Sequence, residues 1–205
     1  MNSYNRAVAV LKGPVKLLYR VECHGTENVP QQGGFLLCAN HTAAMDPLIL
    51  CYAVRRDIHY MVKEEAMKTP VLGAFLKSIG SFAVSRGKVD IKSLKTALGY
   101  LKAGDVVGIF PQGTRCPGVD PRETEPKEGV AMIAYRAKVP VLPVYISTKN
   151  NKVALFKKTV AIIGKPISYD ELGFEKGTAA EYKRASDIIF DRICSIGEDW
   201  ERNKK

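Results

Sequence analysis

The sequence predicts a single α/β domain, with a mostly parallel or mixed sheet flanked by helices. Short apolar runs bounded by Gly, Pro or Asn alternate with longer stretches whose apolar residues recur every three or four positions. The 205 residues are 46% hydrophobic and 25% charged, as in an ordinary globular domain, and no repeat or low-complexity linker divides them. Strands separated by helices pair in parallel, so we expect helices on both faces of the sheet.

Six short apolar runs are the strand candidates, because each is shorter than a typical helix and ends at turn-forming residues. They lie at residues 35–39, 58–62, 81–84, 106–110, 141–146 and 160–163.

Helix signals fill the intervals between these runs. Asp46 precedes a helix at 47–54, Pro70 precedes one at 71–79, and Gly104 ends a third that begins near Ile91. Two further helices are expected at 128–137 and 182–200.

The first 21 residues form a basic amphipathic segment. Arg6, Lys12, Lys16 and Arg20 alternate with apolar side chains, without an acidic residue. The Gly13-Pro14 pair predicts a break into two short helices, because proline is poorly tolerated inside a helix. Amphipathicity fits either a segment on a membrane surface or a terminal helix packed on the core.

The charge points to an anionic partner. Lys and Arg number 31 against 21 Asp and Glu, which gives a net charge of +10. Nucleic acid is not expected, because the chain has no aromatic-basic run, helix-turn-helix pattern or zinc spacing. The five cysteines are scattered, which favours reduced thiols and no metal site. The sequence shows neither a signal peptide nor an apolar run long enough for a transmembrane helix.

Two polar segments follow strand candidates, where ligands of α/β sheets bind. In the first, His41 lies five residues before Asp46, and a turn into the helix can bring the carboxylate to one imidazole nitrogen, leaving the other as a general base. Asp46 can equally cap the helix that starts at Pro47, and both interpretations can hold together.

The second segment offers groups that bind anions. Gly113, Thr114 and Arg115 provide backbone N–H groups, a hydroxyl and a guanidinium whose planar fork suits phosphate. The alternative is that Arg115 pairs with Glu123 or Glu125.

These segments belong to four blocks in which nearly the whole chain resembles the PlsC-like lysophosphatidate acyltransferase family. The family's N-H-x-x-x-x-D-P block is followed by a lysine- and glycine-containing block, an F-P-E-G-T-R block and an apolar V-P-x-x-P-V block. Here they stand as Asn40, His41, Asp46 and Pro47; as Lys63, Glu65, Pro70, Gly73, Gly80 and Arg86; as Phe110 to Arg115; and as Val139, Pro140, Pro143 and Val144, led by Gly129.

The resemblance implies a 1-acylglycerol-3-phosphate O-acyltransferase of phospholipid biosynthesis. A fatty acyl group would pass from acyl-CoA or acyl-ACP to the sn-2 hydroxyl of lysophosphatidate, without a cofactor or metal. His41 would act as the base and Asp46 would orient it. Arg115, with Gln112, Gly113 and Thr114, would bind the acceptor, and Lys63 and Arg86 are further candidates for its phosphate or for the phosphates of the donor.

One residue departs from the family pattern, because Gln112 stands where the family usually has Glu. The amide keeps an acceptor, loses the charge and adds a donor. This leaves room for a different lysophospholipid or lipid alcohol as acceptor, or for a catalytically silent lipid-binding homologue.

The lipid substrate suggests a location. We expect residues 1–21 to lie on an anionic membrane surface and residues 22–205 to form the acyltransferase domain, as a peripheral enzyme on the cytoplasmic side of the cell membrane.

Overall fold

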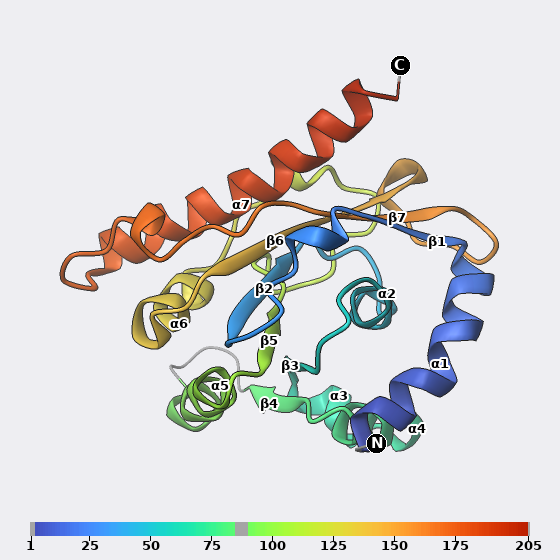
Figure 1. The fold of residues 1–205 in the computed structure, drawn as a ribbon, viewed down its shortest axis with the longest axis horizontal. Helices are drawn as coiled ribbons and strands as arrows, with labels where there is room; N and C mark the ends of the chain where they lie inside the picture. The colour runs from blue at the N-terminus through green and yellow to red at the C-terminus, as the bar shows by residue number, and fades with distance from the viewer. Residues whose placement is uncertain (1–2, 85–89, 205) are drawn as a thin grey trace.

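A seven-stranded mixed sheet forms the centre of the computed structural model, which describes residues 3–84 and 90–204 (Figure 1). The strand order is β1-β7-β6-β2-β5-β3-β4, and every neighbouring pair is parallel except β6 and β7. The strands are β1 (Val21–His24), β2 (Phe35–Ala39), β3 (Ile58–Lys63), β4 (Phe82–Val84), β5 (Val106–Ile109), β6 (Val141–Thr148) and β7 (Thr159–Ile163).

Helices cover both faces of the sheet, as predicted. One face carries α1 and α2, and the other carries α5, α6 and α7 (Figure 1). Alternate residues of β2 serve the two cores: Phe35 and Leu37 pack with α2, whereas Leu36 and Cys38 pack with α6 and α7. The helices are α1 (Ser3–Tyr19), α2 (Asp46–Ala53), α3 (Glu64–Lys68), α4 (Pro70–Ser78), α5 (Ile91–Ala103), α6 (Gly129–Ala137) and α7 (Ala179–Arg202).

Helix α1 is one continuous helix, so the predicted break at Gly13-Pro14 is wrong. Val8 and Val15 lie on either side of the proline, seven residues apart, and both are buried in the core beneath α2. A break between them would withdraw one of the two from the core, and a buried valine is worth about 1.5–3 kcal/mol. This packing offsets the loss of the backbone hydrogen bond that Pro14 cannot make.

One strand of the sheet was not expected from the sequence, and one pair of strands has the antiparallel pairing that the predicted mixed sheet allows. The segment Val21–His24 forms β1 at the edge of the sheet. Apolar and polar residues alternate in this short segment, so it lacks the continuous apolar run that marked the other strands. The final pair of strands, β6 and β7, is antiparallel, because residues 149–158 join them directly instead of through a crossover helix.

The site is positioned by the carboxyl ends of neighbouring parallel strands. β6, β2, β5 and β3 lie side by side and point the same way, so the segments that follow them emerge at one edge of the sheet. Within residues 3–84 and 90–204, no helix combines the length and apolar character needed to cross a bilayer.

Candidate active site

A buried carboxylate holds His41 at the end of β2. The Nδ1 atom of His41 lies 2.8 Å from Oδ2 of Asp46, and Asp46 is fully buried while the imidazole keeps 17% of its surface exposed. Since a carboxylate only accepts hydrogen bonds, Nδ1 carries the proton. Nε2 is then the acceptor of the neutral imidazole, so the pair has the arrangement of a general base and its orienting acid.

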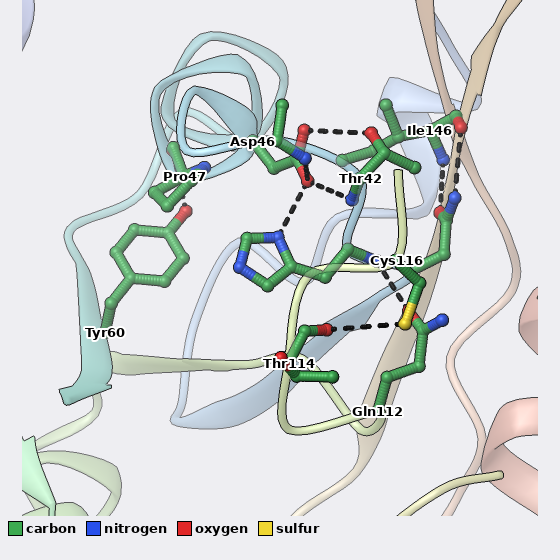
Figure 2. Close-up of polar contacts among 11 residues, drawn as sticks. Thr42, Asp46, Pro47, Tyr60, Gln112, Thr114, Cys116 and Ile146 are labelled. Carbon is green, nitrogen blue, oxygen red and sulfur yellow. Dashed lines mark hydrogen bonds and ion pairs between the residues drawn. The ribbon is translucent and has the colours of Figure 1, made fainter. Parts of the chain in front are cut away.

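Backbone groups hold Asp46 in place. Its Oδ2 accepts hydrogen bonds from the N–H groups of Thr42, at 2.6 Å, and Ala43, at 2.8 Å, and Figure 2 shows Asp46 facing Thr42 across these contacts. Helix α2 begins at Asp46 itself, one residue earlier than predicted, and its N-cap residue is Met45. The carboxylate therefore binds the loop before the helix and the imidazole, and it does not serve as the N-cap.

Asn40 fixes the backbone immediately before His41. Its side chain is fully buried and makes two hydrogen bonds to the backbone of Ile146 in β6: Nδ2 donates to the carbonyl at 3.1 Å and Oδ1 accepts from the N–H at 2.7 Å (Figure 2). Just beyond the end of β2, the Asn40 side chain makes the hydrogen bonds to β6 that a strand backbone would otherwise make. Asn40 belongs to the first sequence block, but no local pattern in the sequence shows that its partner is Ile146.

Aromatic packing sets the plane of the imidazole. The ring of Phe110 stacks on that of His41, with centroids 3.9 Å apart and planes 14° apart. Tyr60 in turn stacks on Phe110, with ring centroids 6.2 Å apart. The Tyr60 hydroxyl donates a hydrogen bond to the carbonyl of Pro47 at 2.9 Å. Gly108 makes room for this ring, because a Cβ there would lie 2.4 Å from Tyr60.

Gln112 is buried, with 4% of its surface exposed, and both ends of its amide have protein partners. Oε1 accepts the backbone N–H of His41 at 2.7 Å, and Nε2 donates to the hydroxyl of Thr124 at 2.9 Å. Thr124 in turn donates to the carbonyl of Pro121 at 2.7 Å. Both polar ends of the amide thus bind protein groups, and the expectation that Gln112 binds the acceptor stays a prediction.

The next three residues form an exposed turn beside His41. Gly113 adopts a φ of +67°, which favours glycine, and its N–H donates to the carbonyl of Phe110 at 2.9 Å. Thr114 and Arg115 are exposed, and the N–H of Cys116 donates to the carbonyl of His41 at 2.8 Å. Among the ion pairs of the described residues, none joins Arg115 to Glu123 or Glu125.

The two remaining candidates are less well placed by the structure. Lys63 is the exposed last residue of β3, at the same sheet edge as the site, and no described contact joins it to His41 or Arg115. Arg86 lies outside the described residues. Across the part of the chain that is described, no three His, Cys, Asp or Glu side chains are grouped as metal ligands.

A sequence model of the Acyltransferase family matches residues 20–147, which include every described residue of this site. A Bacillus subtilis protein named 1-acyl-sn-glycerol-3-phosphate acyltransferase is 34% identical over 167 residues, covering 80% of this chain and 82% of the relative. The chain belongs to the acyltransferase family.

Other acyltransferases extend this comparison. A Borreliella burgdorferi protein with the same name is 31% identical over 133 residues, 62% of this chain and 51% of that protein. The crystal structure of the 1-acyl-sn-glycerophosphate (LPA) acyltransferase PlsC from Thermotoga maritima has a TM-score of 0.66 and 24% identity, covering 96% of this chain and 84% of that one. The predicted α/β fold is therefore confirmed.

Proposed function

We propose that this chain transfers a fatty acyl group from a thioester to the free sn-2 hydroxyl of lysophosphatidate, forming phosphatidate for phospholipid synthesis. The observation that carries the proposal is the hydrogen bond from His41 Nδ1 to buried Asp46, which leaves Nε2 as a base on a partly exposed ring. The names of the Bacillus and Borreliella relatives support lysophosphatidate as the acceptor.

The pair supports direct attack by the acceptor. Nε2 of His41 removes the proton of the hydroxyl as its oxygen bonds to the thioester carbonyl carbon, and Asp46 stabilises the imidazolium that forms. Collapse of the tetrahedral intermediate breaks the carbon–sulfur bond, and the imidazolium returns the proton to the departing thiolate. The hydroxyl is itself the nucleophile, so this route needs no covalent acyl-enzyme.

The acceptor phosphate is assigned to the exposed turn. The hydrogen bond from Cys116 to His41 holds residues 113–115 next to the base, so a phosphate bound there leaves the glycerol hydroxyl near Nε2. Arg115 supplies a bidentate cation, with Gly113 and Thr114 shaping the turn. Lys63 and Arg86 remain candidates for the same phosphate or for phosphates of the donor.

The acyl donor is acyl-CoA or acyl-ACP, and the reaction as written needs no cofactor or metal. Gln112 does not argue for a silent homologue, since its amide supports His41 from within the protein and the His41–Asp46 pair is intact.

The membrane surface is the proposed location, on the cytoplasmic side of the cell membrane. Val10 and Leu17 lie seven residues apart on α1, and their exposed fractions are 73% and 74%. Lys16 and Arg20 are exposed near them. Apolar insertion with attraction of the basic residues to anionic lipid gives reversible binding that salt weakens.

The test is acyl transfer by the purified full chain from radiolabelled acyl-CoA and, separately, acyl-ACP. Lysophosphatidate is compared with other lysophospholipids and lipid alcohols. His41→Ala should abolish transfer, whereas His24→Ala, at an exposed histidine of β1, should not. Near-wild-type turnover by His41→Ala would refute the mechanism, and a faster rate with another acceptor would replace lysophosphatidate.

A further inference from the structure

The loop that joins β6 to β7 exposes an apolar tip between lysines. Residues 149–158, called the β6–β7 loop below, contain four lysines and no acidic residue. At its tip, Leu155 and Phe156 are 53% and 64% exposed. Two large apolar side chains exposed next to each other on a charged loop form a candidate interaction site.

The backbone holds this tip outward. Phe156 has a φ of +60°, in the left-handed region, which a bulky side chain rarely adopts. Its N–H donates to the carbonyl of Leu18 at 2.5 Å, so the conformation is tied to the end of α1. The structure thus maintains an unfavourable conformation that leaves an aromatic ring in solvent.

A short series of hydrogen bonds connects this loop to the active site. The N–H of Gly118 donates to the carbonyl of Asn151 at 2.8 Å, and two residues earlier the N–H of Cys116 donates to the carbonyl of His41 at 2.8 Å. Strand topology agrees, because β6 is parallel to β2 and the loop leaves β6 at the edge where His41 follows β2.

The same loop contacts the C-terminal end of α1. Figure 1 shows the connection between β6 and β7 beside the end of α1 where β1 begins, as the bond from Phe156 to Leu18 requires. Leu17, 74% exposed, immediately precedes that contact. The apolar tip of the β6–β7 loop and the exposed Leu17 of α1 thus belong to two segments, distant in sequence, whose backbones are in contact.

We propose that the β6–β7 loop is a second membrane contact, whose Leu155 and Phe156 insert into an anionic bilayer while its lysines lie among the lipid phosphates. The proposal rests on the proposed function in that the substrate is a membrane lipid. Through Gly118 and Cys116, an inserted loop holds the turn of residues 113–115 at the bilayer surface, where a lysophospholipid can reach His41 without leaving the membrane.

Charge favours a bilayer as the partner. Lys149, Lys152 and Lys157 flank an apolar tip, the pattern of interfacial segments that insert an apolar face and present cations to lipid headgroups. Lys158 pairs with Glu22 at 2.7 Å, but both side chains are about half exposed, so this pair is weak in water.

The test measures binding of the full chain to vesicles of phosphatidylcholine with and without phosphatidylglycerol. The variant Leu155→Gln/Phe156→Asn removes the apolar tip, and asparagine tolerates a positive φ, so thermal unfolding should hardly change. Its partition coefficient should fall about ten- to a hundredfold. Lys157→Glu should weaken binding more than the control Lys102→Glu, which makes the same charge change in the last turn of α5. Added salt should reduce the difference between these two variants.

A second measurement reports insertion directly. Phe156→Trp adds a tryptophan to a chain that otherwise has one, and its emission should shift to the blue when anionic vesicles are added. The proposal is overturned if the Leu155→Gln/Phe156→Asn variant binds vesicles as the wild type does, or if the added tryptophan shows no shift. It is also overturned if the variant loses only self-association of the chain. Absence of acyl transfer by the wild type would refute the proposed function and leave these vesicle results readable.

Discussion

The backbone N–H of His41 donates to Oε1 of Gln112 at 2.7 Å, across 71 residues of sequence. This bond joins the segment after β2 to the segment after β5, the neighbouring strand. His41 is therefore held at its side chain by Asp46 and at its backbone by Gln112. A residue that sequence patterns assign to the substrate thus has a visible role inside the protein.

Changes at Gln112 should separate support of His41 from binding of substrate. Gln112→Leu leaves the N–H of His41 without its buried acceptor, which costs about 1–3 kcal/mol of unfolding free energy, and kcat should fall. Gln112→Glu keeps that acceptor and should retain more activity and stability than Gln112→Leu. Thermal unfolding and steady-state kinetics check both. A changed KM with unchanged kcat and stability would instead show that Gln112 binds the acceptor.

The carboxylate of Asp46 should be required for rate as well as for structure. Asp46→Asn replaces an oxygen that accepts three short hydrogen bonds by an amide that can itself donate, so the imidazole can adopt the wrong tautomer. We expect kcat to fall by about 10² to 10⁴ with a folded protein, measured beside circular dichroism. A loss smaller than tenfold would mean that Asp46 only shapes the loop.

Arg115 should act on acceptor binding. Arg115→Ala removes the guanidinium proposed to hold the phosphate, and KM for lysophosphatidate should rise about tenfold or more. Arg115→Lys should recover only part of this, because an ammonium cannot make the bidentate contact. An acceptor without phosphate should show no such dependence. Unchanged kinetics of Arg115→Ala with lysophosphatidate would remove this residue from the site.

Asn40 should be critical for stability. Asn40→Ala leaves the N–H and carbonyl of Ile146 unpaired in the core, and each unpaired group costs about 1–3 kcal/mol. Asn40→Asp keeps an acceptor for the N–H but sets a carboxylate against the carbonyl, so it should also destabilise the protein. Denaturant unfolding measures both effects. Wild-type stability of either variant would contradict the role given to this amide.

The cysteines should react with alkylating agents in an order set by burial. Desolvation raises the pKa of Cys23 to about 11, against opposing charges of Arg55 and Lys16, and burial likewise raises that of Cys194 to about 11. Since the thiolate is the reactive form, both should be slow at pH 7.5 and accelerate as pH rises toward 11. Cys116 is partly exposed, so its thiol should be labelled first. Its backbone N–H donates to the carbonyl of His41, which places this cysteine beside the site.

Labelling of Cys116 should also slow acyl transfer, because the added group lies beside His41. Cys116→Ser provides the control, since its activity should resist the reagent. Mass spectrometry of the time course identifies the first site. Faster labelling of Cys23 would contradict the burial described here.

Much of the fold was predictable because it depends on local patterns. Five-residue strand β2 has the predicted bounds, since a short apolar run between turn residues has few alternatives. The pairing of His41 with Asp46 was also predictable, because five residues and one turn separate them. Helix α1 shows the limit of such signals: Pro14 predicts a break, but burial of Val8 and Val15 decides otherwise.

The sequence by itself determined the α/β class, the positions of most strands and helices and the histidine–aspartate pair, since each depends on periodicity or spacing within a few residues. Only the tertiary structure decided that Asn40 binds Ile146, that Gln112 binds His41 and that the β6–β7 loop reaches the site through Gly118. These contacts join residues tens of positions apart. Their partners depend on which strands become neighbours, a choice made by burial of the whole sheet between two layers of helices.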